Sequence, residues 1–298
     1  MSAALSPGTG RRYGLLLVSR IWTVSRATVY RQRQRAGELP PARKRPGPIG
    51  PMTDSALVMA IEHLLKTSPF HGEGHRKVWA RLRFEGIRSS RRRVLRLMRE
   101  HGLLAHQRVG KPRGSKAHDG TIITERVDEM WGTDMTAVMT GEGQAAVFIA
   151  VDHCSAECTG IHASRNANRF EALEPVKQGV RECFGAFAEK IATGLKLRHD
   201  HGSQYVSHDF QHEIAFLGLK SSPAYVREPE CNGCAERFIR TLKENLLWIR
   251  RFETIEELRQ ALQDFKETYN QNWIIERHGY RTPAQVRNAQ IGHIPMAA

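Results

Sequence analysis

Three acidic residues lie at positions where a carboxylate is unusual and suggests a chemical role. Asp134 lies inside an apolar stretch that reads as a β-strand, where an unpaired carboxylate is costly to desolvate. Asp200 directly follows another short strand-like stretch, and Glu236 lies 36 positions later on the apolar side of an expected helix. Three carboxylates brought together repel one another unless a divalent cation lies between them. Oxygen ligands of this kind select Mg²⁺ or, alternatively, Mn²⁺, which keep part of their coordination for water and substrate phosphate.

Two basic residues follow Glu236 on the same expected helix. Arg240 and Lys243 lie about one and two turns further along, so that Lys243 shares a face with Glu236. A cation at this place is suited to hold a phosphate beside the metal site. The competing interpretation is a surface lysine that pairs with Glu244 and contributes under about 1 kcal/mol.

The positive charge of the chain is concentrated in its first part. Residues 1–120 contain 25 Lys and Arg against 7 Asp and Glu, a net charge of +18, whereas residues 121–298 have a net charge of −4 and the whole chain +14. This asymmetry predicts a module that binds a polyanion joined to one with another task. The longest apolar run, 145–151, is far shorter than the roughly 20 residues of a membrane span.

The basic part has the pattern of helical DNA-binding modules. Residues 14–35 have helical periodicity interrupted at Ser25, a candidate N-cap, and residues 55–101 predict three helices with a break at Gly86. Three consecutive arginines follow the cap candidates Ser89 and Ser90, where cations oppose the helix dipole unless a phosphate is bound. The candidate DNA-contacting residues of this part are Arg26, Arg31, Arg76, Lys77, Arg91, Arg92 and Arg93.

The second part has the pattern of a mixed α/β domain. Its expected elements are a β-hairpin of strands 130–139 and 145–152, a strand 159–163, a helix 168–191, a strand 195–199, a helix 207–217, a strand 219–222 and a helix 231–249. The two Pro-, Gly- and basic-rich stretches 36–52 and 107–120 have the composition of linkers.

With these residues and spacings the chain resembles a known family, the OrfB-type DDE transposases of the two-reading-frame bacterial insertion sequences, which have a retroviral-integrase-like catalytic core. Thirty-five residues, 201–235, separate Asp200 from Glu236, the separation that names this class. One departure is His201, where the family usually has Arg. The resemblance covers about residues 55–290 and rests on the strings WGTDMT (131–136), DHGSQY (200–205), NGCAER (232–237) with Lys243, YN (269–270) and GYRTPA (279–284), and upstream on GHRK (74–77) and RVLRLM (93–98).

The resemblance implies a fold and a division into domains. The fold class is α/β, an RNase H-like mixed-sheet catalytic core preceded by all-α helix-turn-helix DNA-binding modules. The expected domains are a helix-turn-helix-like segment (1–36), a Pro-rich linker (37–54), a helical DNA-binding domain (55–106), a basic linker (107–122), an RNase H-like integrase catalytic core (123–250) and a C-terminal helical extension (251–298).

The resemblance also implies an activity and its partners. Asp134, Asp200 and Glu236 are the expected catalytic and metal-binding residues of a Mg²⁺-dependent polynucleotidyl transferase that cleaves and joins the ends of its insertion sequence. The expected partner is double-stranded DNA, both the terminal inverted repeats of the element and the target, bound by a homo-oligomer. The chain lacks a leucine-zipper heptad, so a protein from the upstream reading frame is a further expected partner. We expect no membrane partner and a location in the bacterial cytoplasm, at the nucleoid.

Two other function classes compete with this interpretation. A decayed transposase or repressor would bind DNA through the N-terminal helices alone, but it has no reason to keep three carboxylates facing phosphates. A ribonuclease on the same fold is disfavoured by the basic N-terminal region and by Lys243.

Several residues have simpler explanations than catalysis. Asp152 also ends an expected strand, and we predict that it stabilises a turn. His199, Asp200 and Ser203 are too close in sequence for a Ser-His-Asp triad. Two cysteine pairs suggest zinc, but no regularly spaced histidines accompany them: Cys154 with Cys158, and Cys231 with Cys234. Four tryptophans are predicted to belong to the core instead of stacking on bases: Trp22, Trp79, Trp248 and Trp273.

Overall fold

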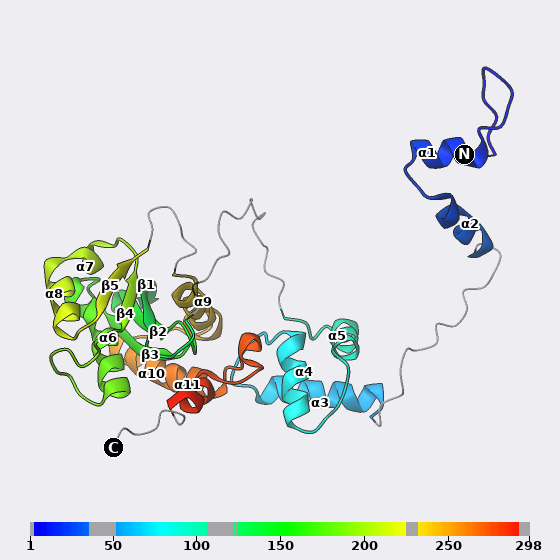
Figure 1. The fold of residues 1–298 in the computed structure, drawn as a ribbon. Helices are drawn as coiled ribbons and strands as arrows, with labels where there is room; N and C mark the ends of the chain where they lie inside the picture. Colours follow the sequence, from blue (N-terminus) through cyan, green and yellow to red (C-terminus); the bar gives the residue numbers. More distant parts are fainter. Residues whose placement is uncertain (1–2, 36–51, 106–121, 123, 225–231, 292–298) are drawn as a thin grey trace. The chain divides into compact units, whose positions relative to one another are not determined.

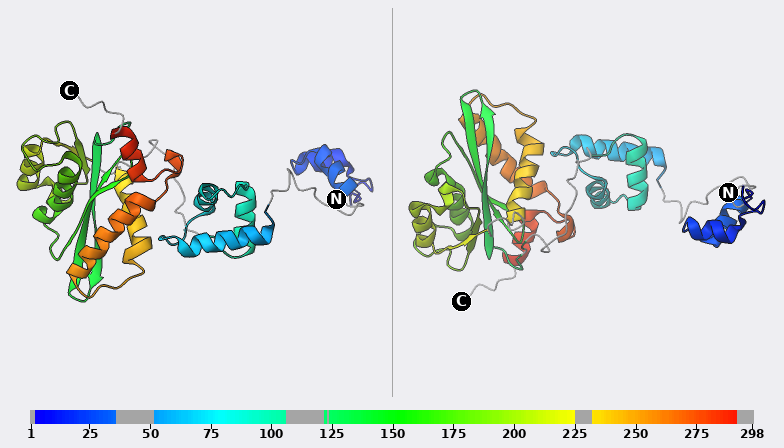
Figure 2. Two further views of the ribbon diagram at one scale, coloured as in Figure 1. Left: turned by 90° about the horizontal axis from the view of Figure 1, so that it is seen from below. Right: turned by 90° about the horizontal axis from the view of Figure 1, so that it is seen from above.

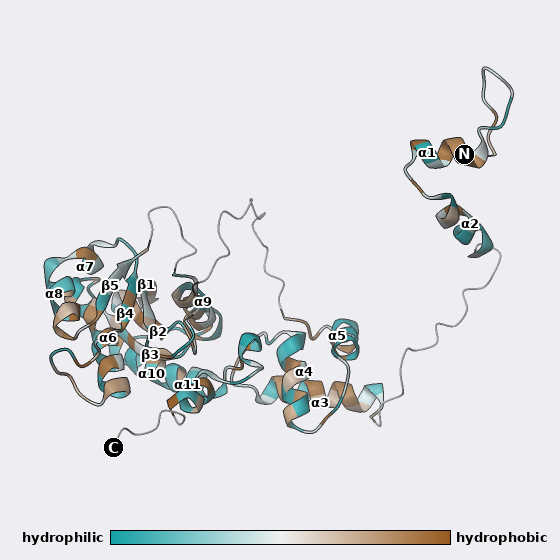
Figure 3. Ribbon diagram, viewed as in Figure 1, coloured by the Kyte–Doolittle hydropathy of each residue, from teal (hydrophilic) through white to brown (hydrophobic). Residues whose placement is uncertain are grey.

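The first compact unit is a pair of short helices. The computed structural model describes residues 3–35, 52–105, 122, 124–224 and 232–291, and the chain divides into units 1–51 and 52–298 (Figure 1). Helices α1 (Gly14–Ile21) and α2 (Arg26–Arg35) confirm the break at Ser25, whose Oγ accepts a hydrogen bond from the Thr28 amide at 3.1 Å. The apolar residues of α1, which Figure 3 colours brown, are mostly exposed, and within the described part of this unit Ser19 alone is buried.

The second unit begins with the three helices that the sequence predicts. These are α3 (Asp54–Thr67), α4 (His75–Phe84) and α5 (Arg91–Glu100), with Thr53 and Ser90 as side-chain caps of α3 and α5. Gly86, with a φ of +80°, reverses the chain after α4 in a conformation that other residues rarely adopt. The helices enclose a core of their own, formed by Leu57, Val58, Ile61, Leu64, Val78, Leu82, Val94, Leu97 and Met98.

A five-stranded mixed sheet follows. Its strands are β1 (Met130–Thr140), β2 (Gly143–Asp152), β3 (Cys158–Ser164), β4 (Lys196–His199) and β5 (Lys220–Pro223), in the spatial order β3-β2-β1-β4-β5. β1 is antiparallel to β2, and β2 to β3, whereas β4 is parallel to both β1 and β5. The expected hairpin is confirmed, because Thr140 pairs with Gly143 across a two-residue turn. β1 is therefore the central strand, at which the antiparallel and parallel halves meet.

Helices cover both faces of the sheet, which Figure 2 shows nearly edge-on. On one face, α6 (Arg169–Phe184), α7 (Ser203–Val206) and α8 (His208–Phe216) close a core around Trp131, Phe148 and Leu197. On the other, α9 (Gly233–Leu242), its π-helical continuation η2 (Lys243–Leu247) and α10 (Ile255–Asn272) close a core around Val147 and Ile149. The short η3 (Glu276–His278) and α11 (Pro283–Ile291) are the last elements of the described residues. Every described helix is too short or too polar to cross a membrane.

Two expected helices have different bounds in the structure. The helix predicted for 168–191 ends at Phe184, because Gly185 takes a left-handed conformation with φ +79° and terminates it. The helix predicted for 231–249 is α-helical over Gly233–Leu242 and π-helical over Lys243–Leu247, and Cys231 lies outside the described residues. α10 lies in the stretch 251–298 that was expected as a C-terminal helical extension. It buries Leu258, Leu262 and Phe265 in the same core as β2 and β3.

Arg287 joins the C-terminal helix α11 to the strand ends. Its guanidinium donates to both carboxylate oxygens of Asp128, at 2.7 and 2.8 Å, and also forms an ion pair with Glu157. Arg287 is only 8% exposed, and Asp152, fully buried nearby, accepts from the Asp128 amide at 2.9 Å. Removing the arginine would leave two carboxylates poorly solvated and without their cation.

We therefore expect Arg287→Met to lower the free energy of unfolding by about 3–5 kcal/mol, since breaking a buried ion pair leaves an uncompensated charge. Arg169→Met is the matched control, because Arg169 pairs with Asp209 at the surface and should contribute under about 1 kcal/mol. Urea unfolding of both variants measures the difference. Equal small losses would show that the Arg287 cluster does not hold α11 to the domain.

Candidate metal and nucleic-acid site

Strand register brings Asp134 and Asp200 to the same place in the sheet. The parallel pairing of β1 with β4 matches Gly132 with Arg198, and Asp134 and Asp200 each lie two residues beyond that pair. Neighbouring strands are roughly 4.8 Å apart, so the backbone positions of the two acids lie side by side although the residues are far apart in the sequence. Asp134 remains paired with β2 through Ile149, whereas β4 ends at His199. Asp134 is therefore held within the sheet, and Asp200 begins the loop beside it.

Glu236 is brought to this place by the close packing of α9 on β1. A Cβ atom on Gly132 would lie 2.6 Å from Asn232 Oδ1 and 3.5 Å from Ala235 Cβ, so the helix start rests directly on the strand backbone. Asn232, which is buried, also donates from Nδ2 to the carbonyl of Thr133 at 3.0 Å. Every second residue of β1 faces α9, and these residues include Gly132, Asp134 and Thr136.

Asp134 and Glu236 line one hollow of about 380 Å³ together with Lys243 and Trp248. Desolvation raises the pKa of Asp134 to about 6, and the negative charges of Asp200 and Glu236 add to this rise, while the Met135 amide and Lys243 oppose it. Partial desolvation also raises the pKa of Glu236. The expectation that Glu236 lies on the apolar side of its helix is wrong, because its side chain is exposed at the edge of the face that Ala235 buries. The exposure leaves this carboxylate accessible from the hollow.

The donor chemistry of the three acids suits a hard divalent cation, because such an ion stabilises carboxylates that would otherwise repel one another. Within the described ranges, however, no three His, Cys, Asp or Glu side chains lie close enough together to hold one metal ion. Asp200 is exposed, and its Oδ1 accepts from the Gly202 amide at 2.8 Å. Its position beside Asp134 therefore comes from the strand register, and its carboxylate is turned toward its own loop.

The two basic residues after Glu236 differ in their surroundings. Arg240 donates from Nε to Glu244 at 3.0 Å, so the surface pair that was the competing interpretation for Lys243 is made by Arg240 instead. Lys243 forms no ion pair among the described residues, and its charge lowers the pKa of Asp134. Both side chains line the acidic hollow. Lys243 is thus the cation that the structure leaves uncommitted there.

The predicted DNA-contacting residues of the N-terminal part differ in the same way. Arg26 and Arg31 are exposed on α2, and Arg92 is exposed at the start of α5. Arg93 forms an ion pair with Asp54 at 2.6 Å. The remaining candidates make contacts within the chain: Arg76 donates to Glu276 at 2.9 Å, Lys77 lies on the ring of Trp273, and Arg91 lies 4.4 Å from the ring centroid of Trp79. The three arginines of α5 therefore do not form one open cluster.

Asp152 has the structural role that the sequence predicts. Its Oδ1 accepts from both the amide and the hydroxyl of Ser155 at 2.7 Å, which closes the turn after β2. Among the cysteines, Cys154, Cys158 and Cys234 are buried thiols, and Cys231 lies outside the described residues.

The prediction for the tryptophans is wrong for two of the four. Trp22 is 59% exposed and Trp248 is 66% exposed, whereas Trp79 and Trp273 are partly buried. The exposure of Trp248 was not predicted, because the expected α-helix was continued past Leu242 on the basis of its apolar spacing. It also gave no separate role to Asn232, although an Asn directly before a helix is a recognisable start signal.

The raised pKa of Asp134 predicts a pH-dependent gain in stability for Asp134→Asn without metal. Because the folded state keeps the proton up to about pH 6, wild-type stability should fall as pH rises from about 4 to about 6. In EDTA, the variant should be more stable by about 1–3 kcal/mol at pH 8 and show little gain at pH 4. Asp209→Asn, at an exposed position, is the control. Equal gains at both pH values would contradict the desolvation of Asp134.

Comparisons with known proteins identify the families to which the chain is similar. The sequence matches the families described as "Integrase core domain" over residues 124–229 and 217–283, and the "HTH-like domain" over 56–111. It is 27% identical over 282 residues to "Transposase InsD for insertion element IS2A/D/F/H/I/K" of Escherichia coli, covering 92% of this chain and 91% of that protein. It is also 27% identical to an "Insertion element IS2A uncharacterized 48.2 kDa protein" of Escherichia coli, of which it spans 66%.

Solved structures of viral proteins also align with this chain. A chain of the simian T-cell lymphotropic virus intasome aligns with a TM-score of 0.47 at 16% identity, covering 80% of this chain and 76% of that one. The HTLV-2 integrase catalytic core, solved in complex with magnesium, aligns with a TM-score of 0.42 at 18% identity, covering 55% of this chain and 98% of that one. With its integrase core and HTH-like domain, the chain belongs to the integrase-core transposases and is homologous to the IS2 InsD, OrfB-type proteins over about 92% of its length.

Proposed function

We propose that the protein is a DDE polynucleotidyl transferase that cleaves and joins the ends of its own insertion sequence. The observation that supports the proposal is the place of Asp134, which shares a hollow with Glu236 and lies beside the end of β4 that precedes Asp200. Desolvation and the charges of these two other acids raise the pKa of Asp134. A protein that only bound DNA would gain nothing from negative charges at this surface, because they repel phosphate.

Asp134, Asp200 and Glu236 would together hold Mg²⁺, with Mn²⁺ as the alternative. When bound, two such ions supply an activated water or 3′-hydroxyl nucleophile and stabilise the leaving oxygen of an in-line displacement. Asp134 is the rigid member of the set, since it is held within β1 between paired residues. Glu236 is positioned by the packing of α9 on Gly132, and Asp200 would exchange its contact with the Gly202 amide for the metal.

Lys243 would hold the phosphate next to the scissile bond. It lines the acidic hollow and forms no ion pair among the described residues, so its charge is available to an anion. The basic first 120 residues, with a net charge of +18, would supply most of the affinity for duplex DNA and make it depend on salt. The partners in this proposal are the terminal inverted repeats and target DNA, a second copy of this chain and the protein of the upstream frame.

We expect Asp134→Asn, Asp200→Asn and Glu236→Gln each to abolish Mg²⁺-dependent cleavage and joining of DNA that contains the element ends. The amides keep the side-chain shape but lose the charge that holds a divalent ion, so DNA binding should survive. Joining on labelled oligonucleotides measures activity. The melting temperature with and without Mg²⁺ measures metal binding separately, and its increase with Mg²⁺ should be smaller in each variant.

Asp209→Asn, which changes an exposed carboxylate of α8, is the control and should join DNA like the wild type. Near wild-type turnover in any one of the three variants would remove that residue from the metal site. Loss of DNA binding together with activity would instead point to a defect in folding.

Lys243→Ala should slow joining at saturating DNA by about tenfold or more, equivalent to about 1.4 kcal/mol of lost stabilisation, and leave the unfolding midpoint nearly unchanged. Arg240→Ala is the matched control one turn away, and its effect should be smaller because Glu244 already neutralises that arginine. A lowered unfolding midpoint with normal joining would show that Lys243 has a structural role and that another group holds the phosphate.

A further inference from the structure

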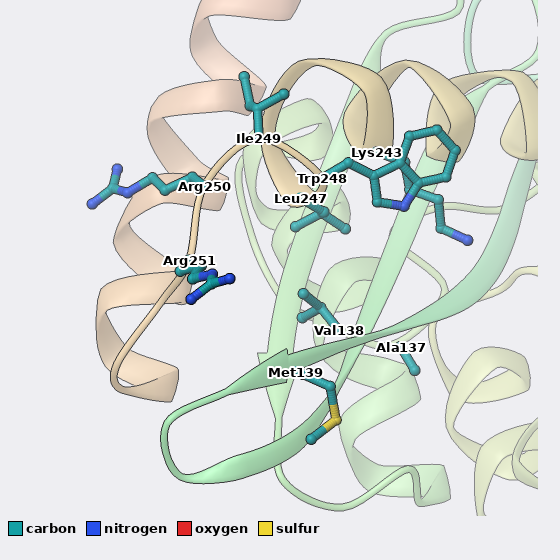
Figure 4. Close-up of a pocket in the computed structure, with 9 residues that line it drawn as sticks. All are labelled: Ala137, Val138, Met139, Lys243, Leu247, Trp248, Ile249, Arg250 and Arg251. Carbon is teal, nitrogen blue, oxygen red and sulfur yellow. The ribbon is translucent and has the colours of Figure 1, made fainter.

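A second hollow, also of about 380 Å³, adjoins the acidic one. It is bordered by β1 on one side and by the end of η2 on the other, and Lys243 and Trp248 line both hollows. Figure 4 shows Lys243 and Trp248 extending side by side, Val138 and Met139 coming from β1, and Arg250 and Arg251 lying at the opposite end. The hollow therefore combines apolar side chains of β1 and η2 with cationic side chains at both ends.

The π-helical segment explains why Trp248 is exposed. Leu242 and Leu247 are both buried although they are five residues apart, which is the hydrogen-bond spacing of a π-helix and not of an α-helix. The Trp248 amide accordingly donates to the carbonyl of Lys243, five residues earlier, at 2.9 Å. Asn245, which is buried, stabilises the widened turn by donating to the Thr241 carbonyl at 2.9 Å. The extra residue turns Leu247 into the core and Trp248 outward over the hollow.

We propose that Trp248 and this hollow form a nucleobase subsite, which receives an unpaired base of the DNA strand whose phosphodiester lies at the acidic hollow. The proposal rests on the proposed function for the presence of DNA at the acids. An exposed indole offers a flat face on which any base can stack, and neighbouring cations hold the backbone on either side of that base. The volume lies within the roughly 300–1,000 Å³ that is usual for ligand sites.

Charge and continuity favour a DNA strand over an apolar ligand or a protein segment. Lys243 and Arg251 make no ion pair among the described residues, and Arg250 pairs with the partly exposed Glu257 at 2.8 Å. A strand that leaves the acidic hollow along the second hollow would pass Lys243 and Trp248, which line both hollows, and reach Arg251, which lines the second. The order cation, aromatic ring, cation matches the alternation of phosphate and base in a single strand.

The experiment uses the full chain in EDTA and two DNA probes of one sequence. One is a blunt 25-base-pair duplex, and the other carries in addition a five-nucleotide single-stranded 3′ tail with one 2-aminopurine, whose fluorescence falls when it stacks on a ring. The wild type should quench the 2-aminopurine and bind the tailed probe more tightly than the blunt one. Trp248→Ala should lose most of the quenching and bind the tailed probe roughly 5- to 100-fold more weakly, with unchanged affinity for the blunt duplex.

Matched variants separate stacking from other effects. Trp248→Phe should keep part of the quenching, and Phe170→Ala, which removes a 55% exposed aromatic ring from α6 on the other face of the sheet, should keep all of it. If Trp248→Ala did not fold, Trp248→Gln would carry the same test. Undiminished quenching in the alanine or glutamine variant, or no quenching by the wild type, would overturn the subsite. The assay contains no metal and no joining step. It can therefore give a negative result for the subsite even if joining requires the three acids, and a positive result even if joining does not require them.

Discussion

The candidate site depends on the close approach of helix α9 to the bare backbone of strand β1 at Gly132. Any side chain at that position would meet Asn232 Oδ1 at 2.6 Å and His153 Nε2 at 2.9 Å, so the strand can accept the helix only where it has no Cβ. Asn232 then fastens the helix start to the Thr133 carbonyl at 3.0 Å. This contact brings α9 to the hollow that Asp134, Glu236 and Lys243 line together.

The carboxylates near Arg287 and those near Asp134 have opposite electrostatic surroundings. Asp128, Asp152 and Glu157 lie near the buried guanidinium of Arg287 and are satisfied by it or by backbone amides and a serine hydroxyl. Around Asp134, by contrast, desolvation and like charges raise the pKa, and the Met135 amide and the charge of Lys243 oppose this rise. The first group stabilises the fold. The second is destabilising in the absence of a cation, which is the behaviour expected of a binding site.

The three-helix domain and the sheet domain share contacts close to the π-helical segment. Phe70, in the loop between α3 and α4, is buried in the core of the sheet domain and meets Trp273 edge-on at a centroid distance of 4.9 Å. The next residue, His71, donates its amide to Asn245 Oδ1 at 2.8 Å. Asn245 thus connects the loop of the helical domain to the turn that exposes Trp248.

The sequence by itself determined the element order and the helical domain, because those depend on local periodicity, caps and spacing. The three helices, the hairpin and the cap at Ser25 follow from patterns that neighbouring residues complete among themselves. What only the tertiary structure decided are features set by packing at a distance. Strand register aligned Asp134 with Asp200, Glu244 paired with Arg240 and left Lys243 open, and Arg93 turned back to Asp54. The exposure of Trp248 could not be predicted, because the switch from α- to π-helix after Leu242 is stabilised by contacts of Asn245 and not by the apolar spacing.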